Sequence, residues 1–317
     1  MGTNSSIKNI LILHPSFKGI GGVSVFVNRL NKLLIDKQIK TKAISFAFYL
    51  KNLNLKFKDS LSLVQISNPL YALLVIVLLF VSRKKIYSIY HFDILRYRNF
   101  KLLSIKLCCR LSNKNIFIND NSYNWAKKNK VNNFVKHSIF IPPIYNSTHT
   151  NNNENIFCTN AYALTHDKDG KEIYGVLTLI DVFKDINNSK LIISDSNNSY
   201  GNYFVENNIK LPKNVILKSY EHDFMDTLYE SNVFIRFTST DGDSLSINEA
   251  LCLNKLVIAS DVVSRPESDN LILIKHNTVE LKEAIEKIIS KNIICTTDNE
   301  FKNRINNNLN NFLCELS

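Results

Sequence analysis

The sequence predicts an α/β protein built from two doubly wound domains. In both halves of the 317 residues, strand-like apolar runs alternate with amphipathic, helix-like runs, which is the pattern of parallel sheets covered by helices. The chain is also long for a single hydrophobic core, because such cores stop growing at about 250 to 300 residues. With 45 % hydrophobic and 21 % charged residues, its composition is that of a packed globular protein. We therefore expect two cores, each built on its own sheet.

The first half is expected to contain five strands and four helices. Short runs rich in Ile, Leu and Val predict strands at residues 9–13, 42–46, 63–66, 86–90 and 115–118. Longer runs predict helices at 23–35, 70–81, 100–110 and 122–130. The helix at 70–81, LYALLVIVLLFV, is apolar throughout, but it rises only about 18 Å, well short of the roughly 30 Å hydrocarbon core of a bilayer. We interpret it as a buried helix, the alternative being a helix with one face in a bilayer.

A polar segment separates the halves. Residues 140–155, FIPPIYNSTHTNNNEN, combine a double proline with an Asn-rich run, which is typical of exposed chain. We place the domains at 1–152 and 153–317. The second domain is expected to have strands at 156–159, 190–194, 215–217, 233–237 and 256–259, and helices at 173–183, 224–231, 248–253 and 279–290. A closing helix at 299–316 is expected to pack back on the first domain.

Charge and cysteine usage restrict the partners and the compartment. Residues 1–150 hold 23 Lys and Arg against 4 acids, a net charge of +19, whereas residues 151–317 hold 16 against 24, a net of −8. The basic half suggests contact with phospholipid headgroups or nucleic acid, the alternative being solvated lysines without a partner. The six cysteines show no C-x-x-C spacing, so neither zinc nor disulfides are expected. The apolar run Ile10–Leu13 is too short for a signal peptide, which favours a cytoplasmic protein.

Open parallel sheets bind ligands beyond the carboxyl ends of their strands, and two turns there stand out. The first is HPSFKGIGGVSVFVNRL, in which Gly19, Gly21 and Gly22 allow close approach to the backbone and a helix from Val23 aims its N–H groups at an anion. The dinucleotide fingerprint G-x-G-x-x-G is not met, because Ser24 stands three residues after Gly21. The pattern therefore argues against a dehydrogenase, and glycines that only form a turn remain the alternative.

The second turn is TSTDGDSLSINEALCLNKLVIASD, which follows the strand at 233–237. A helix starting near Leu245 carries Glu249 one turn in, so Asp241 and Glu249 can reach the same cleft. Ser244 and Ser246 are candidate N-cap residues, and the N–H groups there would bind phosphate. Ionised carboxylates only accept hydrogen bonds, so they suit sugar or ribose hydroxyls. The alternative is that the helix dipole favours acids at this end, which explains the two aspartates but not Glu249.

The same segment, DGDSLSINEALCLNKLVIASD, resembles the E-x7-E region of retaining glycosyltransferases of the group 1, or family 4, type, which use nucleotide sugars in bacterial surface polysaccharide synthesis, such as that of O-antigen or capsule. KNILILHPSFKGIGGVSVFVNRL resembles the first strand and glycine loop of that group, and NAYALTHDKDGKEIYGVLTLIDVF resembles the opening of its second domain. The resemblance implies the GT-B fold: two Rossmann-like doubly wound domains that face a central cleft, with the acceptor bound by the first domain and the nucleotide sugar by the second.

The resemblance also implies roles for individual residues. Glu249 would hold the ribose hydroxyls and Asp241 those of the transferred sugar. His91, in IYHFD, would lie near the transferred sugar, the alternative being a histidine with only a structural role. The first domain would close over the donor at Gly21 and Gly22. The backbone would receive the diphosphate at four consecutive positions, Gly242, Asp243, Ser244 and Leu245.

Two departures from the group's pattern concern the phosphates. The group commonly has an Arg and a Lys near the start of its second domain, where this chain has Asn160 and Tyr174. Another cation is needed there, and the candidates are Arg236, Lys171 and Arg265, with arginine preferred because its planar fork matches phosphate oxygens. Asp241 is also one methylene shorter than the Glu of the group.

The resulting hypothesis is a hexosyltransferase that moves a sugar from a UDP-sugar, with retention, to a lipid-linked saccharide. The nucleotide sugar is a substrate, and neither a cofactor nor a metal ion is expected. The protein would sit peripherally on the inner face of a bacterial plasma membrane, with basic residues on an anionic leaflet: Arg83, Lys84, Lys85, Arg96, Arg98, Lys101 and Lys106.

Three alternatives remain open. A nucleotide-sugar epimerase can share the fold and needs no acceptor. A non-enzymatic protein that binds anionic surfaces or nucleic acid would need base-stacking platforms, whereas the aromatic residues here mostly follow strand or helix periodicity, so no nucleic-acid partner is expected. A catalytically inactive scaffold is the third.

Overall fold

The computed structural model describes residues 9–15, 22–52, 61–137, 139–143, 155–167, 169–241, 244–291, 293 and 295–316. The chain forms two compact units, one made of Met1–Ile141 with Ile305–Ser317 and the other of Pro142–Arg304. The expected domain boundary at residue 152 lies outside the described residues. The units are described separately below.

The first unit is built on a six-stranded parallel sheet. Its strands are β1 (Asn9–His14), β2 (Lys40–Ser45), β3 (Leu61–Ile66), β4 (Ile86–Tyr90), β5 (Lys114–Phe117) and β6 (Phe134–Lys136). They lie in the order β2-β1-β3-β4-β5-β6, and every pairing is parallel. From β1 the chain first adds β2 on one side and then crosses back to add β3 on the other side, so the order of strands reverses at β1. The space beyond the carboxyl ends of β1 and β3 is therefore where such a sheet binds ligands.

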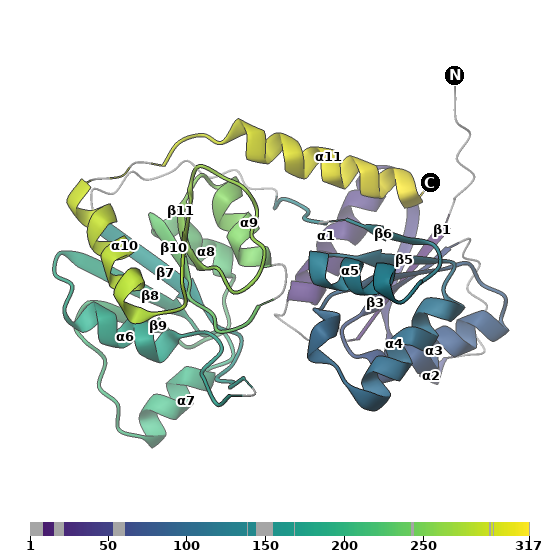
Figure 1. Ribbon diagram of the computed structural model, residues 1–317, viewed down its shortest axis with the longest axis horizontal. Coiled ribbons are helices and arrows are strands. Elements are labelled where there is room, and N and C mark those ends of the chain that lie inside the picture. The colour runs from purple at the N-terminus through teal and green to yellow at the C-terminus, as the bar shows by residue number, and fades with distance from the viewer. Residues whose placement is uncertain are drawn as a thin grey trace. The chain divides into compact units, whose positions relative to one another are not determined.

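Helices cover both faces of this sheet (Figure 1). One core contains α1 (Gly22–Asp36) and the end of α11 (Asn299–Leu316), whose Phe312 and Leu316 are buried against the strands. The opposite core contains α2 (Phe46–Lys51), α3 (Pro69–Val81), α4 (Asn99–Leu111) and α5 (Asp120–Lys128). The short helix η1 (Ile94–Arg96) follows β4. No helix in the described part of the chain is long and apolar enough to cross a membrane.

Capping explains two departures of this unit from the predicted elements, whereas β6 and η1 were not predicted. The second strand ends one residue early, because the Ser45 hydroxyl accepts a hydrogen bond from the Phe48 N–H at 3.1 Å and starts α2, which was not predicted. The helix predicted at 122–130 lies two residues earlier. Asn119 caps its start by accepting from the Ser122 N–H at 2.8 Å, and Lys130 leaves the helix with φ +51°.

The second unit is also built on six parallel strands. These are β7 (Asn155–Asn160), β8 (Ser189–Ser194), β9 (Val215–Lys218), β10 (Val233–Arg236), β11 (Leu256–Ser260) and β12 (Leu271–Ile274), in the order β12-β11-β10-β7-β8-β9. One core packs the sheet against α6 (Val176–Lys184), α7 (Ser199–Glu206) and α10 (Thr278–Lys291). The short helices α8 (Phe224–Glu230) and α9 (Leu245–Cys252) contact the strands as well.

This strand order is that of the Rossmann fold, in which all strands are parallel and the order of strands across the sheet reverses between the first and fourth strands. Here those strands are β7 and β10, which are neighbours in the sheet. Their last residues are Asn160 and Arg236. The sheet therefore places Asn160 and Arg236 side by side at its ligand-binding edge.

A glycine determines where α6 begins. Gly175 has φ +65°, and a Cβ on it would lie 2.3 Å from the Phe237 carbonyl oxygen, so only glycine fits. The helix consequently starts at Val176, three residues later than predicted. The strand β12 and the helix α7 were not predicted. Asp195 caps α7 by accepting from the N–H groups of Ser199 and Gly201 at 3.0 and 2.9 Å, which offsets the weak helix propensity of SYGNYFVE.

Candidate functional site

Two arginines hold one aspartate at the carboxyl edge of the second sheet. The Asp241 carboxylate accepts from Arg236 Nε and Nη2, both at 3.0 Å, and from Arg265 Nη1 at 2.9 Å. The side chains of Arg236, Asp241 and Arg265 are 12 %, 8 % and 1 % exposed. We call these three residues the arginine cluster. It contains two positive charges and one negative charge, so it carries a net charge of +1.

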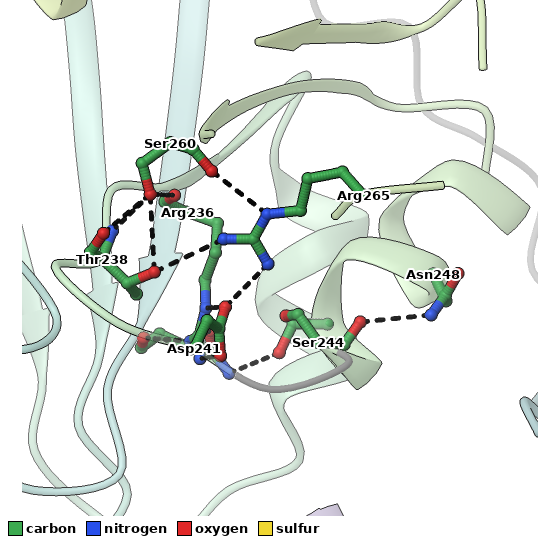
Figure 2. Close-up of polar contacts among 9 residues, drawn as sticks. Arg236, Thr238, Asp241, Ser244, Asn248, Ser260 and Arg265 are labelled. Carbon is green, nitrogen blue, oxygen red and sulfur yellow. Dashed lines mark hydrogen bonds and ion pairs between the residues drawn. The ribbon is translucent and has the colours of Figure 1, made fainter. Parts of the chain in front are cut away.

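The cluster is held in a fixed geometry. Burial alone would raise the pKa of Asp241, but the two guanidinium groups outweigh it and lower that pKa to about 2, so the carboxylate stays ionised at neutral pH. Arg265 Nε also donates to the Ser260 carbonyl at 3.1 Å. The Ser260 hydroxyl in turn donates to the Thr238 carbonyl at 2.8 Å, which ties the turn after β10 to the end of β11 (Figure 2).

Arg236 connects the cluster to the reversal point of the sheet. Its Nη1 donates to the Asn160 side-chain oxygen at 3.3 Å, and its guanidinium lies over the Tyr174 ring, 5.1 Å from the ring centre. Asn160 Nδ2 donates to the Ser246 hydroxyl, in the first turn of α9, at 2.9 Å. The structure thus brings together three of the predicted phosphate-site residues, Arg236, Arg265 and Asn160, and joins them to the start of α9.

The start of α9 has the features of an anion site. Ser244 is its N-cap residue, as predicted, but its side chain makes no capping hydrogen bond. Ser244 is only 7 % exposed, and its buried hydroxyl has no hydrogen-bond partner among the described residues. No acidic residue lies in the first turn of α9. Because unpaired N–H groups and the helix dipole both favour negative charge, a phosphate fits this end of the helix.

The start of α6, at the same edge, is closed by the protein itself. Glu172 accepts from the N–H groups of Val176 and Leu177 at 2.8 and 3.0 Å, so a carboxylate already occupies that helix end. The Tyr200 hydroxyl donates to Glu172 at 2.5 Å, and burial together with this carboxylate raises the pKa of Tyr200. Glu172 was not predicted, although an acid just before a helix is the signal that marks it. Of these two helices, α9 is the one whose start has no side-chain cap among the described residues.

Glu249 lies on α9 and is buried, with 5 % of its surface exposed. It stands three residues after Ser246, so the two side chains share one side of the helix. Ser246 is the residue that contacts Asn160 at 2.9 Å. Glu249 therefore follows one turn along from the contact between α9 and the end of β7.

The other predicted phosphate-site residues are placed as follows. Lys171 is exposed in the turn before Glu172, and within the described residues its side chain makes no hydrogen bond or ion pair with the arginine cluster. Leu245 is the first residue of α9, and Gly22 is the first residue of α1, with open space where a Cβ would be. Three residues lie outside the described part of the chain: Gly21, Gly242 and Asp243.

His91 follows β4 at the carboxyl edge of the first sheet. Its Nε2 lies 2.6 Å from the Gln65 side-chain oxygen on β3, and its ring centre is 5.1 Å from that of Phe26 on α1. With that oxygen as acceptor, Nε2 carries the proton. Burial lowers the pKa of His91 to about 4, so the imidazole is neutral at physiological pH. A neutral, oriented imidazole can hydrogen-bond a hydroxyl without adding charge.

A pair of rings that was not predicted lies beyond β9. Tyr220 and His222 have ring centres 5.1 Å apart, and Tyr220 is exposed. His222 is held at both nitrogens, with Nε2 at 2.8 Å from the Ser194 hydroxyl at the end of β8 and Nδ1 at 2.6 Å from the Tyr220 carbonyl. The signal for this pair was an aromatic residue three positions after the end of a predicted strand. Its exposed ring surface suits a planar group such as a base.

No group of three or more His, Cys, Asp or Glu side chains that could hold a metal ion occurs among the described residues. Asp241, the first acid of the turn that precedes α9, has both its carboxylate oxygens engaged by arginine.

Comparisons with known proteins identify the fold. No family model and no curated protein sequence matches the chain. Among solved structures, HepE from Anabaena in complex with UDP superposes with a TM-score of 0.63 at 14 % identity, over 90 % of each chain. Sucrose-phosphate synthase from Thermosynechococcus elongatus gives 0.65 at 13 % identity, over 89 % of this chain and 90 % of the other. The lipopolysaccharide outer core galactosyltransferase WaaB gives 0.60 at 12 % identity, over 91 % and 92 %. The predicted GT-B fold, with two Rossmann-like units, is confirmed.

Proposed function

We propose that this protein is a glycosyltransferase that transfers a sugar from a nucleotide diphosphate donor, a UDP-sugar, to a saccharide acceptor. The observation that carries the proposal is the arginine cluster beside the start of α9, which has no side-chain cap among the described residues, at the reversal point of the second sheet. A net positive, buried cluster next to a helix start suits a diphosphate. UDP in the structure of HepE, which shares the fold, supports the choice of donor.

Within this proposal the second unit binds the donor. Arg236 and the start of α9 neutralise the diphosphate. Arg265 helps to hold Asp241 in place, and Asp241 in turn orients Arg236. Asp241 is engaged by both arginines, so its role shifts from holding a sugar hydroxyl to positioning the guanidinium groups. Glu249 holds the ribose hydroxyls, because a carboxylate on that side of α9 is acceptor-only. Tyr220 offers its ring to the nucleotide base.

The transfer is proposed to occur with retention at the anomeric carbon. The acceptor oxygen bonds to that carbon on the face from which the diphosphate leaves, the bond to the diphosphate oxygen breaks, and the acceptor proton passes to the diphosphate. Arg236 stabilises the charge that develops on the leaving group, which is the usual large contribution of a preorganised site. No side chain acts as a nucleophile and no metal ion is required. His91, neutral and held by Gln65, orients a hydroxyl of the transferred sugar.

The acceptor is proposed to be a lipid-linked saccharide at the inner face of the bacterial plasma membrane, bound by the first domain, in O-antigen or capsule synthesis. The likeness to WaaB, whose name refers to lipopolysaccharide, supports this choice. The basic first half supports attachment to an anionic leaflet, with exposed Arg83, Arg98 and Lys101 at the ends of α3 and α4. The side chain of Arg96, a further predicted lipid contact, lies outside the described part of the chain.

A panel of nucleotides and nucleotide sugars tests the proposal by thermal shift and turnover. A ligand that binds only the folded protein adds about 2.7 kcal/mol of stability at 100 times its dissociation constant. We expect UDP and one UDP-sugar to raise the melting temperature, and that sugar nucleotide to release UDP only when an acceptor or water is consumed. Stabilisation by no nucleotide diphosphate would contradict the proposal. Conversion of the sugar nucleotide to an isomer without release of UDP would identify an epimerase instead.

A further inference from the structure

A cavity of about 530 Å³ lies in the first unit, away from the edge that carries His91. Asn113 and Asn133, which line it, directly precede β5 and β6, so the cavity lies at the amino ends of these strands. His91 follows the carboxyl end of β4. Because the strands are parallel, the two places are at opposite edges of the sheet. The proposed transfer reaction makes no use of this cavity.

Three cations line the cavity and no acid does. The lining contains Lys106 and Arg110 from α4 and Lys130 from the turn after α5, together with asparagine side chains and no Asp or Glu. Across the described residues none of these three cations forms an ion pair, whereas the nearby Lys114 and Lys136 are paired with acids. Three like charges around one cavity repel one another, and an anion inside it would relieve that repulsion.

Several acceptors around the cavity are already engaged by the protein itself. The last carbonyls of α5 are occupied, since those of Trp125, Ala126 and Lys127 accept from the N–H groups of residues 129–131. At the end of α4, the Cys108 carbonyl accepts from both the N–H and the hydroxyl of Ser112. The Asn113 side-chain oxygen accepts from the Ile86 N–H at 2.7 Å, so its amide nitrogen is the group that remains. The three cations and the Asn113 amide nitrogen together suit a phosphate-like anion.

The outer face of α4 joins the cavity to an apolar surface. Leu103, Lys106 and Arg110 are spaced three and four residues apart and therefore share one face of the helix. Leu103 and the preceding Phe100 are 53 % and 79 % exposed. The neighbouring helix α3, which packs against α4, adds exposed apolar side chains along one stripe, namely Leu70, Leu74, Val77 and Val81. Exposed apolar side chains beside cations are typical of surfaces that lie on an anionic bilayer.

We propose that this cavity binds the phosphate of an anionic phospholipid headgroup while the exposed side chains of α3 and α4 enter the bilayer interface. The proposal gives the membrane attachment suggested above a defined binding site. It does not depend on sugar transfer, and its test measures binding alone, so the two proposals can fail separately.

The test compares two double variants of the full chain that remove the same charge. In Arg110→Gln/Lys130→Gln both cavity cations are lost, whereas Lys127→Gln/Lys128→Gln removes two exposed lysines of α5 that do not line the cavity. Co-sedimentation is measured with vesicles of phosphatidylglycerol and phosphatidylcholine. Two phosphate-contacting cations at about 1 kcal/mol each correspond to a loss of about 30-fold in vesicle affinity for the cavity variant. Equal losses in both variants would mean that diffuse charge holds the membrane, and would overturn the proposal.

A second readout uses Trp125, the single tryptophan of the chain, whose carbonyl accepts from Asn129 in the cavity lining. Soluble short-chain phosphatidylglycerol is expected to change its fluorescence saturably in the wild type and the control, but not in the cavity variant. Inorganic phosphate is the comparison ligand. Saturation by phosphate at the same or a lower concentration would assign the cavity to free phosphate and overturn the lipid proposal. No response to phosphatidylglycerol would also overturn it.

Discussion

The guanidinium of Arg236 lies 5.1 Å from the centre of the ring of Tyr174, the residue that stands where the glycosyltransferase group that the sequence resembles commonly has a lysine. Arg236 Nη1 also donates at 3.3 Å to Asn160, which stands where that group commonly has an arginine. In the proposed function, Arg236 from β10 supplies the positive charge that the resembled group has on the β7 side of the reversal point. Asp241 orients this arginine through two hydrogen bonds.

Arg236→Lys is expected to weaken diphosphate binding more than nucleoside binding. A lysine keeps the charge but loses the two parallel bonds to Asp241 and the stacking on Tyr174. The loss of hydrogen bonds to a charged group corresponds to about 1.5–3 kcal/mol, or about 10- to 150-fold in the dissociation constant of UDP. Calorimetric titration with UDP and with uridine measures both. An equal loss for the two ligands would remove Arg236 from the phosphate site.

Glu249→Ala is expected to weaken UDP and uridine alike, by about 1.5–3 kcal/mol, since both ligands carry the ribose. Calorimetric titration with UDP and with uridine measures this variant too. Glu249→Ala should weaken both ligands, whereas Arg236→Lys should weaken mainly UDP. Glu249 is buried, and a melting curve of the variant is the control for folding. If uridine bound this variant as tightly as the wild type, the ribose would have another partner.

Asp241→Asn is expected to lower the free energy of unfolding by about 3–5 kcal/mol, because it leaves two buried guanidinium groups without their shared carboxylate. The matched control is Asp181→Asn. Asp181 pairs with Lys184 on an exposed helix surface, where such a pair contributes about 0.2–1 kcal/mol. Urea denaturation at pH 7 compares the two variants, and similar losses would show that the arginine cluster is not a structural anchor.

His91 is expected to lower the free energy of unfolding in mild acid. Its pKa is lowered to about 4 by burial, against about 6.5 in the unfolded chain. The unfolded state therefore takes up the proton first, and the free energy of unfolding falls as the pH drops from about 6.5 to about 4, by at most about 3 kcal/mol. Urea denaturation at several pH values should show a smaller fall for His91→Gln. Identical pH profiles would mean that the imidazole titrates normally.

Gly175→Ala is expected to destabilise the protein more than Gly170→Ala. Both glycines have positive φ, so each variant bears the backbone penalty of an L-residue there. Only at Gly175 does the new Cβ meet the Phe237 carbonyl, at 2.3 Å, whereas at Gly170 it meets nothing within 4 Å. The difference should be about 1–3 kcal/mol, the usual cost of overpacking. Equal melting temperatures would show that the loop before α6 can move away from β10.

Local sequence patterns predicted most of the elements because each depends on its own residues. The strand β4 and the helix α11 have the predicted bounds, since apolar periodicity and flanking polar residues define them. The helices α2 and α7 were missed because their starts depend on side-chain caps just before them, Ser45 and Asp195, rather than on apolar periodicity. The start of α6 was misplaced because Gly175 must pass close to Phe237, which is 62 residues away in the chain.

In the candidate site, too, some features follow from the local sequence and others from contacts between distant residues. The sequence by itself determined which turns leave the sheets, where the acids and arginines stand along the chain, and that α9 starts near Leu245, because these depend on short-range patterns. Only the tertiary structure decided that Asp241 is held by two arginines, that Glu172 closes the start of α6, and that Arg236 lies over Tyr174. The physical reason is the order of strands in the sheet: β7 and β10 become neighbours only when it assembles, and that pairing brings distant charges together.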